Sequence, residues 1–327
     1  MLAFVIRRLL QASAVMLVVA FIAFSLFQYV GDPVMALVGQ DATPEQREQL
    51  RTDLGLDRPF YVQFAHFVRN AVHGEFGLSY RQGRRVSSLI RERMPATLEL
   101  SFAAAALALF VGVPMGVYTA LRRRGLLSNV FLALSLIGVS LPTFLIGILL
   151  ILVFAVMLGW LPSFGRGETV SIGWWTSGYF TTDGWLHLIL PAITLCLFQM
   201  TLIMRLVRSE MLEVLRTDYI KFARARGLSD RTVHFGHALK NTLVPVITIA
   251  GLQLGAIIAF AIITETVFQW PGMGLLFIQA VQVADIPIMA AYLCLIALVF
   301  VVINLIVDLL YFAVDPRLRA DRAAGAH

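Results

Sequence analysis

Residues 241–264 read NTLVPVITIAGLQLGAIIAFAIIT, a stretch without a single Asp, Glu, Lys or Arg. A helix needs about 20 residues to cross the hydrocarbon core of a bilayer, so this stretch is long enough to span a membrane. Lipid cannot satisfy backbone hydrogen bonds, which leaves helices or closed barrels, and nothing in the chain alternates like a barrel strand. The stretch therefore predicts a transmembrane helix and an all-α fold.

Further charge-free stretches of this kind recur along the chain of 327 residues, which is 59% hydrophobic and only 14% charged. Such a composition is too apolar for a soluble domain of this size. We predict an all-α polytopic membrane protein with six transmembrane helices. Their expected positions are about 9–31, 100–121, 128–158, 185–207, 242–265 and 287–312.

The topology depends on residues 125–165, which are long enough for one bent span or two short ones. Two spans would place residues 205–240, with eight basic and four acidic residues, outside the cell, against the positive-inside rule. One span, bent at Pro142, is the better interpretation. It puts both termini in the cytoplasm, an external segment at 32–98 and a cytoplasmic loop at 208–240.

Two polar stretches are expected outside the membrane. Within the first, Pro44–Leu54 and Phe60–Val72 have the composition and spacing of short helices, and Phe60–Val72 is expected to lie along the membrane surface. The second, residues 159–183, is rich in Trp and Tyr and is expected at headgroup level. Because no linker, internal repeat or low-complexity tract divides the chain, we predict a single transmembrane domain over residues 1–327.

Motifs typical of several enzyme and metal-site classes are missing. No Gly-x-x-x-x-Gly-Lys-Ser/Thr sequence is present, so the chain cannot hold a nucleotide in a P-loop. Gly138-Val139-Ser140 resembles the Gly-x-Ser of intramembrane serine proteases, but the only histidine near a span is His187. His66 and His73 share a helix face without a third ligand. We predict no enzyme activity and no catalytic, cofactor-binding or metal site.

The net charge of +6 comes from the side expected to be cytoplasmic. We interpret it as a topology signal and a contact with lipid, because no basic run alternates with aromatics as a nucleic-acid groove requires. Cys196 and Cys294 lie in separate apolar spans and are expected to be packing residues. The expected environment is a lipid membrane, with no nucleic-acid partner.

One candidate functional site lies in the cytoplasmic loop, where residues 218–228 read DYIKFARARGL. Ala223 and Gly227, four residues apart, indicate a shallow dent on one face of a short helix, and the basic residues around them keep that helix at a water-facing surface. Such a helix is suited to being bound by another protein. The alternative is a solvated basic connector that only fixes topology.

A second candidate site lies at the end of the fifth span, where Glu265 precedes Trp270-Pro271-Gly272. Ionisable residues near the bilayer are few and often functional. Glu265 is either an outer-interface residue that caps a turn or, with Trp270, part of an outer gate, and both interpretations stay open. Asp308 and Asp315 lie at the inner end of the last span and are expected to be structural.

These residues, and others over nearly the whole chain, resemble the permease subunits of ABC importers, and within them the dipeptide/oligopeptide branch of DppB/OppB-like proteins. The stretches that carry the resemblance are Arg7-Arg8-Leu9, Gly31-Asp32-Pro33, Leu54–Pro59, Gly74–Ser79, Pro95–Leu100, Leu190-Pro191-Ala192, Arg208–Leu215, Ala223–Gly227, His237–Pro245, Thr264–Phe268, Trp270-Pro271-Gly272 and Asn304–Asp308. The generic permease signature Glu-Ala-Ala is replaced here by Lys221-Phe222-Ala223, as in the peptide branch.

The resemblance implies a type I importer permease in a bacterial cytoplasmic (inner) membrane. A second, homologous permease would complete the translocation path, two ABC ATPase subunits would bind ATP and Mg, and an extracytoplasmic binding protein would deliver the substrate. The 218–228 segment would couple the permease to an ATPase. The residues implied in this coupling are Tyr219, Phe222, Ala223, Ala225, Arg226, Gly227 and Leu228.

The substrates implied by the resemblance are dipeptides, oligopeptides or similar small solutes. The same branch also includes importers of glutathione, nickel and some sugars, and the sequence does not choose among them. The functional alternative is a stand-alone secondary carrier or channel. A six-span chain with few acids in the middle of the membrane is poorly equipped for that alternative.

Overall fold

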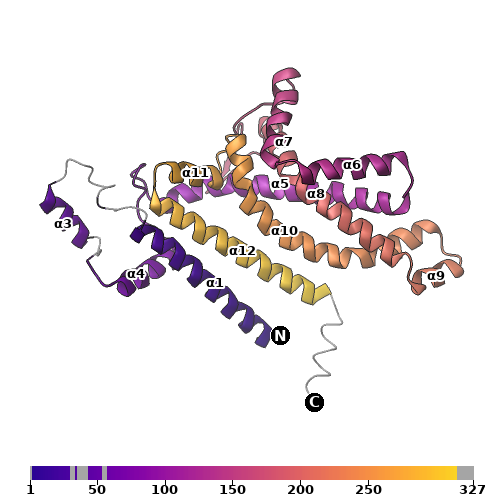
Figure 1. The fold of residues 1–327 in the computed structure, drawn as a ribbon, viewed down its shortest axis with the longest axis horizontal. Coiled ribbons are helices and arrows are strands. Elements are labelled where there is room, and N and C mark those ends of the chain that lie inside the picture. The colour runs from indigo at the N-terminus through magenta and orange to yellow at the C-terminus, as the bar shows by residue number, and fades with distance from the viewer. Residues whose placement is uncertain (1, 30–33, 35–42, 54–56, 315–327) are drawn as a thin grey trace, which may run out of the picture. The chain divides into compact units, whose positions relative to one another are not determined.

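The computed structural model describes residues 2–29, 34, 43–53 and 57–314 (Figure 1). Most of the described chain is helical. The elements are α1 Leu2–Tyr29, α3 Pro44–Asp53, α4 Phe60–Val72, α5 Val86–Leu121, α6 Leu126–Ser140, α7 Thr143–Leu150, η1 Ile151–Met157 (a π-helix), β1 Val170–Ile172, β2 Trp175–Ser177, α8 Thr182–Val214, α9 Asp218–Ala225, η2 Thr232–Ala238 (a π-helix), α10 Leu239–Val267, α11 Met273–Gln282 and α12 Ile286–Val314.

Five of these helices contain a stretch long and apolar enough to cross a membrane. They are Ile6–Leu26, Val86–Leu121, Thr182–Val214, Pro245–Val267 and Ile286–Val307. A sixth crossing is possible if the helices on either side of Pro142 count as one broken span. The structure is therefore that of a polytopic helical membrane protein with five to six spans.

The expected bend at Pro142 is a sharp corner. The helices Leu126–Ser140 and Thr143–Met157 meet at 113°, as a broken span or a re-entrant loop does. Proline has no backbone N–H and disfavours helical backbone at the residue before it. Leu141 is accordingly extended, with φ −91° and ψ 137°.

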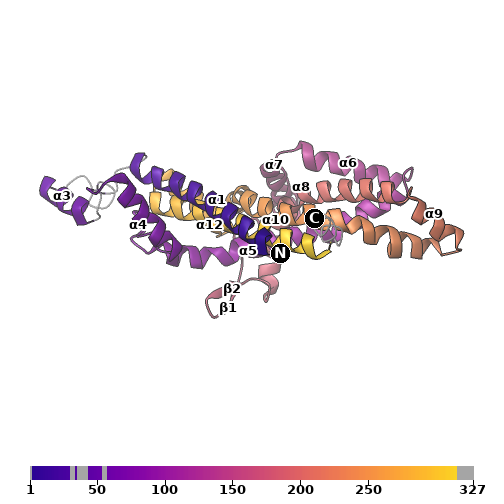
Figure 2. The same cartoon turned by 90° about the horizontal axis from the view of Figure 1, so that it is seen from below.

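The all-α prediction missed one small element. Residues Val170–Ile172 and Trp175–Ser177 pair as an antiparallel hairpin, labelled β1 and β2 in Figure 2. Gly173 follows β1 with φ +63°, a left-handed backbone that glycine adopts without a steric penalty. The sequence signal for the hairpin turn is therefore short, and the aromatic residues of the segment indicated a stretch at headgroup level instead.

The described chain packs as two compact units, and each takes residues from three separate stretches. The first comprises Met1–Thr97, Val170–Ser177 and Gln269–Val301. The second comprises Leu98–Thr169, Gly178–Phe268 and Val302–His327. Neither unit is a contiguous stretch of sequence, so no linker signal marks the division.

In the first unit, helix α4 packs its aromatic face against helix α1. The rings of Phe60, Phe64 and Phe67 lie within 5.1–5.8 Å of Phe24, measured between centroids. The prediction of a helix over Phe60–Val72 is confirmed. Next to Phe24 in α1, Ala23 packs against Ala290 of α12, and the two helices run side by side in Figure 1. The membrane-surface location of α4 stays a prediction.

In the same unit, the buried carboxylate of Asp285 holds the loop before α5. It accepts hydrogen bonds from the Ser79 hydroxyl at 2.5 Å and from the backbone N–H groups of Tyr80 and Arg81 at 3.2 and 3.3 Å. A buried charge is stable only when such donors surround it. Asp285 thus fixes residues 79–81 next to the start of α12.

In the second unit, helix α8 packs against α6, α7 and α10, and glycines allow close approach to α5. A Cβ atom at Gly116 of α5 would lie 2.8 Å from the carbonyl oxygen of Met204 on α8. At Gly112, one turn earlier, the corresponding distance to the Met200 carbonyl is 3.0 Å. This Gly-x-x-x-Gly pair is the usual device for packing two membrane helices closely.

Candidate functional site

Helix α9 covers Asp218–Ala225 and ends in a Schellman motif. The N–H of Gly227 donates to the carbonyl of Arg224 at 2.9 Å, and the N–H of Leu228 donates to that of Ala223 at 3.4 Å. Gly227 has φ +76°, the left-handed conformation that this motif requires after the last helical turn. The glycine is therefore a helix terminator, and the helix is shorter than the segment 218–228.

One face of α9 is buried inside the protein. Ile220 is fully buried and Ala223 is 7% exposed, and the helix packs against η2, whose Val233 is also buried. The interpretation of Ala223 and Gly227 as one surface dent is wrong. Ala223 is buried in a helix that packs against the chain's own η2, whereas Gly227 lies outside the helix, in open space.

Exposed apolar side chains lie on another face of α9 and directly after the helix. Phe222 is 64% exposed, Tyr219 42% and Leu228 38%. Tyr219, Phe222 and Arg226 are spaced by three and four residues and so share one face, and the Arg226 guanidinium carbon lies 5.9 Å from the centroid of the Phe222 ring. We call Tyr219, Phe222, Arg226 and Leu228 the α9 surface. Ala225 is also exposed.

Few polar contacts tie the α9 surface to the rest of the chain. The Asn241 amide of α10 donates to the Tyr219 hydroxyl at 2.6 Å. The Lys221 ammonium lies 2.9 Å from the Asp218 carboxylate, and both side chains are exposed. Asp218 also lies in the first turn, where a negative charge favours the helix. The contacts fix the helix while leaving Phe222 free to meet a partner.

The two expected gate residues are buried in separate units. Glu265 lies in α10, two residues before its end, and is fully buried. It lies in the last turn of the helix, and its interpretation as a turn-capping interface residue stays a prediction. Trp270 is 1% exposed, and its indole N–H donates to the Ala96 carbonyl at 2.9 Å. A gate role for this pair stays a prediction. Asp308 lies in α12, and Asp315 lies outside the described residues.

A second polar site surrounds Glu99 of α5, within the second unit. Its carboxylate accepts from the Arg166 guanidinium at 2.5 Å and from the Gly178 N–H at 3.2 Å, and its carbonyl accepts from the Tyr179 hydroxyl at 2.6 Å. Glu99 is 3% exposed and Arg166 7%. We call Glu99, Arg166, Gly178 and Tyr179 the Glu99 cluster.

The cluster continues into the start of α8. Thr181 caps the helix by accepting from the Gly184 N–H at 3.0 Å, and its hydroxyl donates to the Glu168 carbonyl at 2.7 Å. The Glu168 N–H in turn donates to the Asp183 carboxylate at 2.7 Å. Gly167 lies between these partners with φ +69°, and a Cβ there would lie 2.5 Å from the Asp183 carboxylate. The loop 166–168 is thus held tightly on α8.

Burial and the Glu99 charge raise the pKa of Tyr179 to about 12. The phenol therefore stays protonated at neutral pH and donates to the Glu99 carbonyl. Sequence reasoning placed Glu99 and the region around Arg166 at the ends of apolar spans and missed their pairing. The sequence signal that could have indicated this pairing is Glu99 itself, an acid directly next to an apolar run and without a solvated loop before it.

No group of three or more His, Cys, Asp or Glu side chains that could hold a metal ion occurs in the described part of the chain. Cys196 and Cys294 are both buried and unpaired by any disulfide, consistent with packing residues. The arrangement thus offers two features to interpret: an exposed apolar helix face and a closed buried ion pair.

Comparison with protein families gives two matches that together cover nearly the whole chain. Residues 112–320 match the model described as the inner membrane component of binding-protein-dependent transport systems. Residues 1–101 match the N-terminal model of the same membrane component.

Individual relatives match over their full length. The chain is 36% identical over 332 residues to the dipeptide transport system permease protein DppB of Alkalihalophilus pseudofirmus, covering 98% of this chain and 100% of that one. It is 37% identical over 321 residues to the glutathione transport system permease protein GsiC of Escherichia coli K12, covering 98% and 99%.

Among solved structures, the chain resembles the inward facing MetNI methionine ABC transporter. The TM-score is 0.56 at 20% identity, over 69% of this chain and 96% of that one. This likeness shows a shared fold. It supports the type I importer permease fold that the sequence predicted.

Proposed function

The chain belongs to the family of inner membrane components of binding-protein-dependent transport systems, and we propose that it forms half of the translocation path for di- or oligopeptides or similar small solutes. It is a multi-pass permease subunit of an ABC importer in a bacterial inner membrane. This assignment favours the permease over the stand-alone carrier or channel. The peptide substrate is supported by the names of relatives such as the dipeptide permease DppB.

The proposed complex contains a second, homologous permease, two ABC ATPase subunits and an extracytoplasmic substrate-binding protein. ATP and Mg would bind to the ATPase subunits and not to this chain. Both termini and α9 would face the cytoplasm, in keeping with the positive charge of residues 205–240. ATP-driven closure of the ATPase pair would then move α9 and switch the path between inward-open and outward-open states.

The observation that carries the coupling role is the exposure of Phe222. Its ring is 64% exposed on a helix whose other face is anchored by the fully buried Ile220. Together with the exposed Tyr219 and Leu228 it forms an apolar surface, and exposed apolar patches rimmed by polar residues are typical of interaction sites. An amphipathic helix that lays its apolar face into a groove of another protein is a common recognition mode. The basic residues beside Phe222 favour a groove with an acidic rim.

The coupling role is tested by Phe222→Asp in the tagged, complete transporter. A charge in an apolar groove disrupts docking, so we expect the ATPase subunits to be lost on purification while the permease still inserts into the membrane. The matched control is Tyr61→Asp, since Tyr61 is an even more exposed aromatic residue, on α4. Normal ATPase retention and normal uptake with Phe222→Asp would overturn the assignment of α9 as the coupling helix.

The class and the substrate are tested by mild-detergent purification of the native complex with mass spectrometry. A second permease and P-loop ATPases that co-purify would support the importer. The ligand of the accompanying binding protein, measured by calorimetry against dipeptides, longer peptides and glutathione, would identify the substrate. A chain that purifies alone and catalyses flux alone in liposomes contradicts the proposal.

A further inference from the structure

Helix α9 is attached to the rest of the second unit at both of its ends, and the two attachments differ. On one side, residues 215–217 join it to α8 in a short turn. The N–H groups of these three residues donate back to carbonyls of α8 at 3.0–3.1 Å, so the turn continues the hydrogen bonding of that helix. On the other side, residues 226–231 lead to η2, which runs directly into α10.

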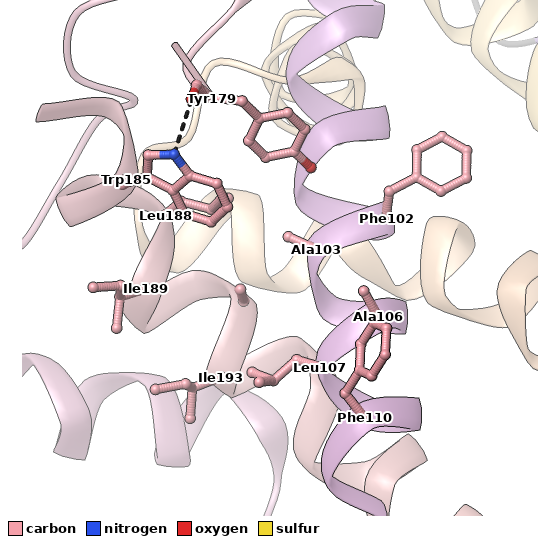
Figure 3. A pocket seen from close by; sticks show the side chains of 11 residues that line it. Phe102, Ala103, Ala106, Leu107, Phe110, Tyr179, Trp185, Leu188, Ile189 and Ile193 are labelled. Carbon is pink, nitrogen blue, oxygen red and sulfur yellow. Dashed lines mark hydrogen bonds between the residues drawn. The ribbon is translucent and has the colours of Figure 1, made fainter. Parts of the chain in front are cut away.

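The attachment to α8 is rigid, because the half of α8 that leads to α9 packs closely on α5. Gly112 and Gly116 of α5 allow this contact beside Met200 and Met204. Near the start of α8, over residues 188–193, the two helices separate, and a groove of about 600 Å³ lies between them (Figure 3). The contact between α5 and α8 is therefore tight on the side from which α9 continues.

The attachment through η2 and α10 is deformable, because two irregularities alter its helical hydrogen bonding. Residues Thr232–Ala238 form a π-helix, a turn that is frequent at functional sites. Pro245 lies inside α10 and has no N–H, so the carbonyl of Asn241, four residues earlier, lacks its helical donor. Helices bend at such gaps. Because Pro245 also begins the part of α10 that is apolar enough to span a membrane, a bend here tilts the start of the helix against its span.

A side-chain hydrogen bond joins α9 to α10 at this gap. The Asn241 amide donates to the Tyr219 hydroxyl at 2.6 Å. Beside it, the fully buried Ile220 of α9 and Val233 of η2 belong to two elements that pack together. Tyr219 is also part of the α9 surface, where it is 42% exposed. Its ring is thus available to a partner while its hydroxyl is bound to the weak point of α10.

On the basis of the proposed coupling role of α9, we propose that the hydrogen bond between Tyr219 and Asn241 is the link through which a displaced α9 bends α10 at Pro245. Because the turn to α8 is rigid, a force on α9 acts on the deformable arm. The Tyr219 hydroxyl and the Asn241 amide transmit it to a helical turn that lacks one hydrogen bond. Asn241 acts through Tyr219 and is therefore a positioning residue.

The link is tested by amide hydrogen exchange and mass spectrometry of the complete transporter, with its ATPase subunits and binding protein. Exchange is compared with Mg alone and with Mg and a non-hydrolysable ATP analogue. In the native complex, we expect the analogue to change exchange in the peptide of residues 218–228. We also expect it to raise exchange in the peptide of residues 239–248, because bending weakens the helical hydrogen bonds there.

Two substitutions remove the link while keeping its surroundings. Tyr219→Phe retains the aromatic ring for docking and removes only the hydroxyl, and Asn241→Leu removes the donor at similar volume. Each should lower the analogue-dependent rise over residues 239–248 about fivefold, equivalent to about 1 kcal/mol. The change over residues 218–228 should remain. The double variant should add nothing to either single one, because both remove the same hydrogen bond.

Matched controls separate the link from general effects of these substitutions. Tyr61→Phe on α4 and Asn129→Leu on α6 alter exposed residues outside the link and should leave both peptides unchanged. Pro245→Ala restores the missing helical N–H and leaves the Tyr219–Asn241 hydrogen bond in place. It should also lower the rise over residues 239–248, and it serves if a side-chain variant assembles poorly.

Two results would overturn the proposal, and they are distinguishable. A rise over residues 239–248 that is the same in the native, Tyr219→Phe and Asn241→Leu complexes means that the hydrogen bond is not the link, while the coupling role of α9 stands. A native complex with bound ATPase subunits in which the analogue leaves residues 218–228 unchanged means that α9 is not the coupling helix, and the proposed coupling role then fails as well.

Discussion

The α9 surface and the Glu99 cluster contain similar residue types, but those of the α9 surface are exposed and those of the Glu99 cluster are mostly buried. In or beside each of them lie an acid paired with a base and a tyrosine hydroxyl in a hydrogen bond. A glycine with positive φ lies next to each, Gly167 after Arg166 and Gly227 after Arg226. At the Glu99 cluster the charges are buried, with Glu99 3% and Arg166 7% exposed. At α9 the paired Asp218 and Lys221 side chains are 96% and 68% exposed.

The difference shows which of the two regions is complete within the single chain. The Glu99 carboxylate and carbonyl receive donors from residues 67–80 positions away in the sequence, so the cluster is closed by the chain itself. The α9 surface instead leaves the Phe222 ring uncovered. Buried, satisfied polar groups fix a structure, whereas an exposed apolar face on a polar segment is available for a partner.

The largest expected effect comes from breaking the buried ion pair. Arg166→Met leaves the Glu99 carboxylate buried without its cation and should lower the free energy of unfolding by about 3–5 kcal/mol. Thermal unfolding of the detergent-solubilised transporter, followed by size-exclusion fluorescence, measures the loss. The double variant Glu99→Leu with Arg166→Met should recover much of it. A single variant as stable as the native chain would contradict the role of the pair.

The next largest effect is expected when Gly167 is substituted, and the comparison is with the same substitution at Gly227. Gly167→Ala combines left-handed strain with a Cβ 2.5 Å from the Asp183 carboxylate and 2.6 Å from the His187 ring. Gly227→Ala meets nothing within 4 Å, so only the backbone strain of about 1–2 kcal/mol remains. We expect Gly167→Ala to lower the apparent melting temperature clearly more than Gly227→Ala. Equal losses would mean that the loop 166–168 is not held on α8 as described.

A smaller effect is expected from raising the pH. The pKa of Tyr179 is raised from about 10 to about 12, so folding favours its protonated form. Its contribution to stability is fully present below about pH 10 and is lost as the pH rises towards 12. Tyr179→Phe should remove this part of the alkaline loss. The measurement is thermal stability of both proteins across that range, and identical alkaline profiles would exclude Tyr179 as the source.

The smallest effect is expected at the exposed ion pair. Lys221→Met removes the partner of Asp218, but both side chains are solvated and screened, so stability should stay within experimental error. Compared with Arg166→Met under the same conditions, it measures how much burial strengthens one kind of ion pair. A loss similar to that of Arg166→Met would mean that the α9 pair is covered, for example by an ATPase subunit that remains bound.

Sequence reasoning succeeded where local pattern is sufficient. Apolar runs predicted the spanning helices, and the spacing of Phe60, Phe64 and Phe67 predicted α4 with its correct bounds. Pro142 predicted the break between α6 and α7, but it did not predict the angle of 113° between the two helices. Proline fixes where a helix stops, whereas the angle of the corner depends on what the two arms pack against.

Interpretation of individual side chains was less successful. Ala223 and Gly227 have the spacing of a dent on a helix face, but Ala223 is buried inside the protein and Gly227 ends the helix. The sequence contains the right small residues for either arrangement. Only the position of η2 and the φ of +76° distinguish a packing alanine and a capping glycine from a shared surface.

By itself, the sequence determined that this protein is a helical membrane permease, because apolar runs longer than a bilayer core and a series of family motifs are both local properties of the chain. The tertiary structure alone decided that Glu99 meets Arg166, that α9 turns Phe222 outward, and that α5 and α8 leave a groove between them. Each of these depends on residues far apart in the sequence, and their approach follows from helix packing, which no single stretch encodes.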